Sequence, residues 1–174
     1  MAQLTVRIYG DPVLRKMAEP VEEINEEIRQ LAANMLETMY ANDGIGLAAN
    51  QVGVLKRIFV MDLQLEENNP GPMVFINPEI KNPRGSDVME EGCLSIPGVR
   101  GDVKRAKEID FEALTLDGKK ITLHAEGLLA RVMLHETDHL NGRLFVDYLS
   151  PVKKMMIRDE LRALEKKAAK LQVA

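Results

Sequence analysis

The sequence predicts an α+β fold, with antiparallel β-sheets packed around a central helix and further helices near both ends. Helical and strand patterns follow one another in the order helix, strands, helix, helix, rather than as repeated strand–helix units. A strong hairpin turn at Asp117-Gly118 joins two alternating segments, as antiparallel neighbours require. The length of 174 residues suits one core, so we expect a single domain over 1–174, with 151–174 as its C-terminal helix.

The first third of the chain is predicted to hold two helices. Asp11 and Pro12 favour a short helix through Met17, because aspartate caps a helix start and proline suits its first position. The next segment has apolar residues three or four apart, which indicates one face of an amphipathic helix. These residues are Ile24, Ile28, Leu31, Met35 and Met39. The run Asn42-Asp43-Gly44 should end this helix.

The remaining elements follow from alternation and helical spacing. The predicted strands are residues 57–63, 73–77, 108–116 and 120–124. In the third of these, Ile109, Phe111 and Ala113 share one side, which should face the core. Residues 127–140 have a helical pattern, and Pro151 begins a last helix that runs toward Leu171.

Composition and charge exclude several functional classes. The net charge is −4, which does not favour binding to DNA. No apolar run reaches the ~20 residues of a membrane helix, and the first residues lack the apolar region of a signal peptide. The single cysteine, Cys93, excludes an intrachain disulfide and fits a reducing compartment. We therefore expect a protein that is cytoplasmic or already processed, without DNA or membrane partners. We also expect a monomer.

The segment His135-Glu136-Thr137-Asp138-His139 lies in a predicted helix and indicates a metal site. Two histidines four residues apart project from one face of a helix, so both imidazoles can reach one ion. Glu136 stands beside the first histidine, where a carboxylate can exchange protons with a water on the ion. The pattern favours a metal-dependent hydrolase.

A hydrolytic ion of this kind needs a third protein ligand and one open position. One metalloprotease class has a third histidine where this chain has Phe145, which cannot bind an ion. Another class takes a glutamate from a later helix, and Glu160 has the matching offset. His124 is the other histidine of the chain, and Cys93 is a soft donor between nearby glycines that allow close backbone approach. Glu160, His124 and Cys93 are all candidates at this point.

Three segments together resemble the signature motifs of peptide deformylases. They are Gly44-Ile45-Gly46-Leu47-Ala48-Ala49-Asn50-Gln51, Glu91-Gly92-Cys93-Leu94-Ser95 and His135-Glu136-Thr137-Asp138-His139. The order of the motifs and the chain length are also similar, and the resemblance covers nearly the whole chain. It implies a single catalytic domain that removes the N-formyl group from the formylmethionine of nascent polypeptides and releases formate.

The resemblance also implies a role for each motif residue. The ligands of one divalent ion would be Cys93, His135 and His139, with water in the fourth position. Glu136 would act as general base and then as general acid while hydroxide on the ion attacks the formyl carbon. The side-chain amide of Gln51 and the backbone N–H of Leu94 would stabilise the oxyanion.

Further residues are implied in substrate binding. The backbone of Ile45 and Gly46 would pair with the extended peptide, and Arg100 and Leu128 would help line the methionine pocket. Two positions depart from the family pattern. Leu134 stands where glutamine is common, and Arg131 stands where the family tends to place an apolar pocket residue.

Asp138 lies beside a ligand on a packed helix, so it needs a partner for its charge. We expect it to pair with a basic residue such as Arg105. A thiolate and two imidazoles suit several ions by their softness. The resemblance implies Fe²⁺ in the cell, with Zn²⁺, Ni²⁺ or Co²⁺ able to replace it.

The C-terminal helix carries many basic residues interleaved with acidic ones, and the simplest interpretation is a solvated face. These basic residues are Lys153, Lys154, Arg158, Arg162, Lys166, Lys167 and Lys170. The alternative is a contact with the ribosome through salt-sensitive bonds to RNA phosphates.

Two rival functions remain open from the sequence. One is a zinc endopeptidase whose ligands are His135, His139 and Glu160, which would keep its ion in the variant Cys93→Ala. The other is a non-catalytic binding module stabilised by a metal, for which Glu136 would have no importance.

Overall fold

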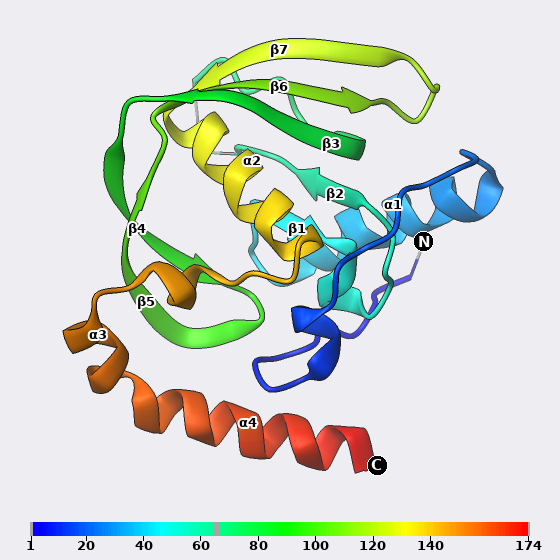
Figure 1. Ribbon diagram of the computed structural model, residues 1–174. Coiled ribbons are helices and arrows are strands. Elements are labelled where there is room, and N and C mark those ends of the chain that lie inside the picture. Colours follow the sequence, from blue (N-terminus) through cyan, green and yellow to red (C-terminus); the bar gives the residue numbers. More distant parts are fainter. Residues whose placement is uncertain (1, 65–66, 174) are drawn as a thin grey trace.

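The computed structural model describes residues 2–64 and 67–173, and it has the predicted α+β architecture (Figure 1). Within these residues, one sheet has five antiparallel strands in the order β1-β2-β3-β6-β7, and β4 and β5 form a separate two-stranded sheet. The strands are β1 Gly46–Ala48, β2 Ile58–Met61, β3 Met73–Arg84, β4 Asp87–Cys93, β5 Ile96–Arg105, β6 Glu108–Leu114 and β7 Lys120–Glu126.

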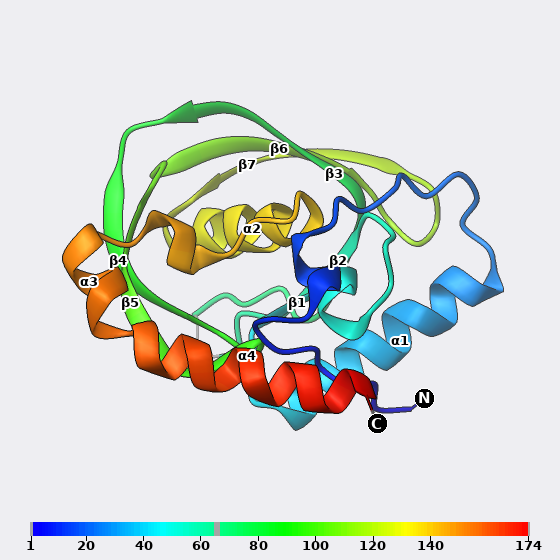
Figure 2. The same ribbon diagram turned by 60° about the horizontal axis from the view of Figure 1, so that its bottom comes forward.

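The helices surround and fill the space between the sheets. The α-helices are α1 Glu26–Ala41, α2 Gly127–Leu140, α3 Pro151–Met156 and α4 Arg158–Val173. Short 3-10 helices are η1 Pro12–Arg15, η2 Ala49–Val52 and η3 Phe145–Tyr148. Figure 2 shows α2 enclosed by the curved sheets, with α4 across the outside. The prediction of a central helix that carries the two histidines, with helices near both ends, is confirmed.

The core between α2 and the five-stranded sheet follows the alternation of β6. Ile109, Phe111 and Ala113 are buried, as predicted, and β6 pairs with β7 through the expected turn. The rings of Phe59, Phe75 and Phe111 meet at centroid distances between 4.9 and 6.0 Å. From α2, Ala130, Met133 and Leu140 complete this cluster. The helix is therefore fixed along one side by apolar packing.

The N-terminal helices start and end where local hydrogen bonds allow. Asp11 caps η1 as predicted, because its side chain accepts from the N–H of Val13, but the helix ends at Arg15. The second helix begins later than its apolar spacing predicted. Asn25 is the N-cap, and its side chain accepts from the N–H of Ile28, so Ile24 lies before the helix.

Strands β4 and β5 were not predicted, and β3 is longer than residues 73–77. Residues 79–84 of β3 are almost all exposed and pair with β6 in an irregular register, so they have no alternation of buried apolar residues. In β5, the buried positions Val99, Gly101, Val103 and Arg105 do alternate with exposed ones, but two of them are not apolar. A search for alternating apolar residues therefore misses this sheet.

The predicted single helix over 151–174 is two helices. Ile157 lies between α3 and α4, is buried, and packs in a cluster with Phe145 and Leu149. No glycine or proline marks this break. Ala174 lies outside the described residues. Among the described residues, no helix is both long enough and apolar enough to span a bilayer.

Candidate metal centre

The end of β4 and the middle of α2 bring three potential ligands together. Cys93 comes from the strand, and His135 and His139 come from successive turns of the helix. One ligand atom from each residue lies within 4.8 Å of the other two. The Cys93 Sγ atom is 3.3 Å from the Nε2 atom of His139. Their predicted proximity is therefore present in the structure.

The chemistry of these residues fits a divalent ion. The Nδ1 atom of His135 is hydrogen-bonded to Glu91 at 2.8 Å, so the lone pair of Nε2 is left to bind an ion. Oε2 of Glu136 and Nδ1 of His139 are buried without a partner among the described residues. A thiol, two imidazoles and a carboxylate that lacks a partner form a set that suits a borderline or soft cation.

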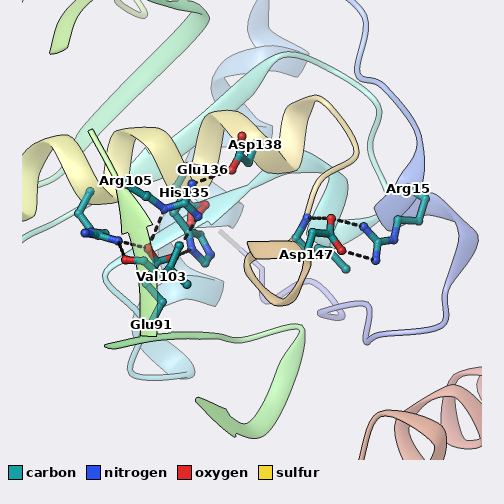
Figure 3. A network of polar contacts seen from close by, with 10 residues as sticks. Arg15, Glu91, Val103, Arg105, His135, Glu136, Asp138 and Asp147 are labelled. Atoms are coloured by element: carbon teal, nitrogen blue, oxygen red, sulfur yellow. Dashed lines mark hydrogen bonds and ion pairs between the residues drawn. The ribbon is translucent and has the colours of Figure 1, made fainter. Parts of the chain in front are cut away.

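A buried charged network supports His135 from behind (Figure 3). Glu91 accepts from His135, from Nε and Nη2 of Arg105 at 2.7 and 3.0 Å, and from Arg131 at 2.7 Å. Although burial would raise the pKa of Glu91, the bonds from His135 and Arg105 hold it well below its usual range. Nη1 of Arg105 also donates to Asp138 at 2.7 Å, so the predicted pairing of these two residues is confirmed.

Sequence reasoning missed the roles of Glu91 and Arg131 in this network. The sequence does not show which way the Arg131 side chain points, and in the structure its guanidinium is directed toward Glu91 and two backbone carbonyls. Its position one turn before His135 was a usable signal, because a charge on the packed face of a helix requires a partner.

Glu136 lies against the backbone of the first motif. It is 4% exposed, and a Cβ atom at Gly46 would be 3.0 Å from its Cδ atom. The absence of a side chain at Gly46 therefore makes room for the carboxyl group. Burial raises the pKa of Glu136 to about 7, with Glu91 adding to the rise and cationic neighbours opposing it. A cation bound beside it would favour its ionised form.

Gln51 is held in η2 with its amide directed at the thiol. Its Oε1 atom accepts from the N–H of Ala48 at 2.9 Å. Its Nε2 atom donates to Ser95 at 3.0 Å and contacts the Cys93 Sγ atom at 3.3 Å. Ser95 is fully buried, and its orienting contact was not predicted although it lies in the second motif.

The site opens into a cavity of about 360 Å³. Ile45 and Gly46 line one side, and Leu128 and Arg131 of α2 line another. Gly46 begins β1, which is an edge strand of the larger sheet. Arg100 also lines the cavity, and its Nε donates to Glu90 at 2.9 Å on the exposed rim. The cavity is thus lined by all four residues that were predicted to bind substrate, which are Ile45, Gly46, Arg100 and Leu128.

The alternative ligands lie elsewhere. His124 is on β7, where its Nδ1 atom is 2.9 Å from Arg84 and 3.4 Å from Asp110. Glu160 is exposed on α4. Among the described residues, neither belongs to the group formed by Cys93, His135 and His139.

Comparisons with known proteins agree with this geometry. The family model for polypeptide deformylase matches residues 3–155. A peptide deformylase of Alkalilimnicola ehrlichii is 52% identical over 94% of this chain and 92% of its own. One of Acinetobacter baumannii is 47% identical over 100% of this chain and 98% of its own.

Solved structures are similar over the same extent. The crystal structure of a peptide deformylase from Legionella pneumophila has a TM-score of 0.86 at 42% identity and covers 97% of this chain and 98% of its own. One from Synechococcus elongatus in complex with actinonin has a TM-score of 0.83 at 44% identity, covering 97% and 89%.

Proposed function

The chain belongs to the peptide deformylase family, and from that premise we propose how its own residues carry out the family's reaction. The protein is a metallohydrolase that removes the N-formyl group from the formylmethionine of nascent polypeptides and releases formate. The observation that carries the assignment of roles is the meeting of Cys93, His135 and His139 beside Glu136.

Cys93, His135 and His139 are the proposed ligands of one divalent ion. Such an ion supplies a Lewis acid that polarises the formyl carbonyl and makes a bound water more acidic. The bond from Glu91 to His135 fixes the tautomer and the direction of that imidazole. The contact of Gln51 with the Cys93 Sγ atom orients the thiolate in the same way.

Glu136 is the proposed general base and acid. Its Oε1 atom is 3.8 Å from the Nε2 atom of His135, and its Oε2 atom faces no other partner among the described residues. It can therefore take a proton from the attacking water and return that proton to the departing amine. Packing against Gly46 holds the carboxyl group at the edge of the cavity.

Gln51 and Leu94 are proposed to stabilise the oxyanion. One N–H of Gln51 donates to Ser95, and the other is directed at the thiol at 3.3 Å. This second N–H is the one that can turn to an oxygen next to the ion. The backbone N–H of Leu94 follows the ligand directly in the chain and can supply a second donor. Two preorganised donors of this kind contribute several orders of magnitude in rate, at about 10²–10³-fold each.

The substrate peptide is proposed to add a strand beside β1. Gly46 begins an edge strand, and Ile45 precedes it with its carbonyl already accepting from the N–H of Asp62. The remaining backbone groups of Ile45 and Gly46 are proposed to pair with an extended peptide. The methionine side chain would then enter the cavity toward Leu128, with Arg100 at the rim. A cavity of about 360 Å³ is large enough for an unbranched side chain and part of the backbone.

The test of this proposal is formate release from the peptide formyl-Met-Ala-Ser under anaerobic conditions. Glu136→Gln should lower kcat by about 10²–10⁴-fold and keep its metal, because only proton transfer is removed. Glu160→Gln is a matched control that should keep the wild-type kcat and the bound metal. Normal turnover by Glu136→Gln would contradict the assigned role and would favour a structural metal site.

Cys93→Ala separates the deformylase ligand set from that of a zinc endopeptidase. We expect the variant to lose its ion, as measured by metal analysis after gel filtration, because a thiolate ligand is removed. An unchanged metal content, together with loss of metal in Glu160→Gln, would support the rival ligand set.

Fe²⁺ is the proposed native ion, with Zn²⁺, Ni²⁺ or Co²⁺ able to replace it. The mixed thiolate and imidazole set binds all of these ions, so selection in the cell depends on availability. Metal analysis of protein prepared without oxygen should find iron. Activity should fall on exposure to peroxide, which attacks both Fe²⁺ and an accessible thiolate. Full activity after peroxide would contradict the proposal.

A ribosome contact through α4 is proposed as well. The helix buries Ala168 on one side and exposes Arg158, Arg162 and Lys166 on the other. Reversing the charge of exposed α4 residues should weaken ribosome co-sedimentation and spare activity on the short peptide. Lys119→Glu is a control on the opposite part of the fold. Co-sedimentation that charge reversal leaves unchanged would refute the contact. Point variants are preferable to truncation, because α4 covers core residues.

We further propose that residues 1–174 act as a single catalytic domain, as a monomer and in the cytoplasm. Sedimentation at working concentration should give the mass of one chain, 19.5 kDa, and not a multiple of it. Cell fractionation should recover the protein with cytoplasmic markers.

A further inference from the structure

Arg131 has no part in the reaction proposed above, yet its side chain is buried. It is 5% exposed, lies on α2 one turn before His135, and forms part of the cavity wall. A guanidinium stays charged at all working pH values, so burial at this depth requires partners.

The guanidinium contacts three groups, and all three belong to the two-stranded sheet. Nη1 donates to Oε2 of Glu91 and to the carbonyl of Val103, each at 2.7 Å. Nη2 donates to the carbonyl of Asp87 at 2.9 Å. Asp87 and Glu91 are in β4, and Val103 is in β5. One side chain of α2 is therefore bonded to both strands of the sheet that carries Cys93.

Arg131 supplies the second guanidinium for a pair of buried carboxylates. Glu91 and Asp138 bring two negative charges, and Arg105 and Arg131 bring two positive charges. With an apolar residue at position 131, Glu91 and Asp138 would have to share the single guanidinium of Arg105 directly behind His135. The planar fork of arginine neutralises Glu91 and still reaches one acceptor on each strand, which a lysine ammonium does less well.

Side-chain bonds of this kind join β4 to α2, in addition to the apolar packing of β5 against the segment after α2. Among the described residues, β4 and β5 pair only with each other and share no ladder with the larger sheet. We propose that Arg131 is a positioning residue, which joins α2 to both strands of the two-stranded sheet and thereby fixes Cys93 relative to His135 and His139. The inference rests on the ligand set of the proposed function.

The test uses the Co²⁺-loaded protein and a chelator in excess. The visible absorption of a cobalt–thiolate centre reports both that Cys93 binds the ion and how fast the ion leaves. Arg131→Met should release Co²⁺ about 10–100-fold faster than wild type, the loss typical when an outer partner of a ligand is removed. Backbone amides of residues 87–105 should also exchange hydrogen faster, while those of β6 and β7 keep their rates.

Arg84→Met is the matched control, because it removes an arginine from an ion-paired cluster on the larger sheet. It should release Co²⁺ at the wild-type rate. Equal release rates in wild type and Arg131→Met would overturn the inference, as would faster exchange spread evenly over both sheets. A wild type without cobalt–thiolate absorption would instead contradict the ligand set itself.

Arg131→Lys keeps the test decisive should Arg131→Met fail to fold. It retains the positive charge beside Glu91 but loses the fork that reaches both strands. We expect a smaller increase in release and in local exchange, in the same direction. Wild-type values of both rates in folded Arg131→Lys would overturn the positioning role.

Discussion

Two clusters of the same residue types lie in very different surroundings. On β3, β6 and β7, Arg84 lies between Glu108 and Asp110 and contacts His124, and its side chain is 42% exposed. Beside the metal centre, Arg105 lies between Glu91 and Asp138, Glu91 holds His135, and Arg105 and Glu91 are each 6% exposed.

The difference lies in what each cluster can fix in place. We call the exposed cluster around Arg84 the outer cluster and the buried cluster around Arg105 the inner cluster. Exposed ion pairs are screened by water and contribute little to stability, so the strands of the outer cluster depend on the apolar packing beneath them. Buried pairs are costly to break because one partner is left charged without water. The inner cluster therefore gives the metal centre a defined geometry, which an apolar contact of the same size does not provide.

The largest effect is expected when the inner cluster loses its central cation. Arg105→Met removes the positive charge that neutralises the carboxylates of Glu91 and Asp138. It should therefore lower the free energy of unfolding by about 3–5 kcal/mol. Urea unfolding measures this loss, and metal analysis should find less bound ion. A loss below about 1 kcal/mol would place the inner cluster in the same class as exposed pairs.

A second prediction concerns Glu136, which lies next to the inner cluster. A methyl group at Gly46 would be 3.0 Å from its Cδ atom, so Gly46→Ala should displace the carboxyl group. We expect kcat on a short formyl peptide to fall by about 10–100-fold, the effect of a small misplacement of a reacting group. Stability should change little. Unchanged kcat would show that Glu136 tolerates displacement.

Arg15 and Asp147 form a pair whose side chains are 44% and 38% exposed, as much as those of the Arg84 cluster, but which is joined side by side, as Figure 3 shows. Two bonds of 2.7 and 3.0 Å join them. Although partial burial would raise the pKa of Asp147, the bonds from Arg15 and the N–H of Leu144 lower it. A carboxyl group with a lowered pKa stabilises the fold above its unfolded pKa, and this contribution disappears as the pH falls through the folded value.

We therefore expect Arg15→Met to cost about 0.5–1 kcal/mol at pH 7, after allowance for solvent screening. The difference from wild type should shrink as the pH falls below about 4. Asp147→Asn should lower the free energy of unfolding by a similar amount at pH 7 and should differ less from wild type below about pH 4, as measured by urea unfolding. A difference that persists unchanged in acid would mean that packing, and not charge, carries the effect.

The smallest effect is expected at Arg84. Arg84→Met should leave the urea midpoint and the metal content within error of wild type, because its partners remain hydrated. A large loss of stability at Arg84 would contradict the distinction between the two clusters.

The elements that sequence analysis predicted correctly are those with apolar spacing and clear end signals. Alternation in β6, the Asp117-Gly118 turn and the helical face of α2 all have this form. Strands β4 and β5 lack it, because Gly101 and Arg105 occupy inward positions of β5 and Glu91 is buried in β4. The inner cluster thus replaces the apolar pattern on which strand prediction depends.

The same reason limited the prediction of the candidate site. Motifs placed Cys93, His135 and Glu136 near one another, since helical spacing and a soft donor are visible in a sequence. Only one pairing behind them, between Arg105 and Asp138, was predicted. The contacts of Glu91 with Arg131, and of Gln51 with Ser95, depend on two strands whose position was unknown.

The chain leaves the larger sheet at the end of β3, forms the two-stranded sheet, and returns to the larger sheet at the same place. Arg84 at the end of β3 pairs with Glu108 at the start of β6, and the N–H of Lys107 donates to the carbonyl of Arg84 at 3.1 Å. Residues 85–107 are therefore a cassette inserted in what would otherwise be a simple β3–β6 hairpin. A cassette from a relative could be grafted between the same two ends to exchange one wall of the site as a unit. The graft would need apolar residues at the positions of Ile96, Val99 and Val103, which pack against the segment after α2.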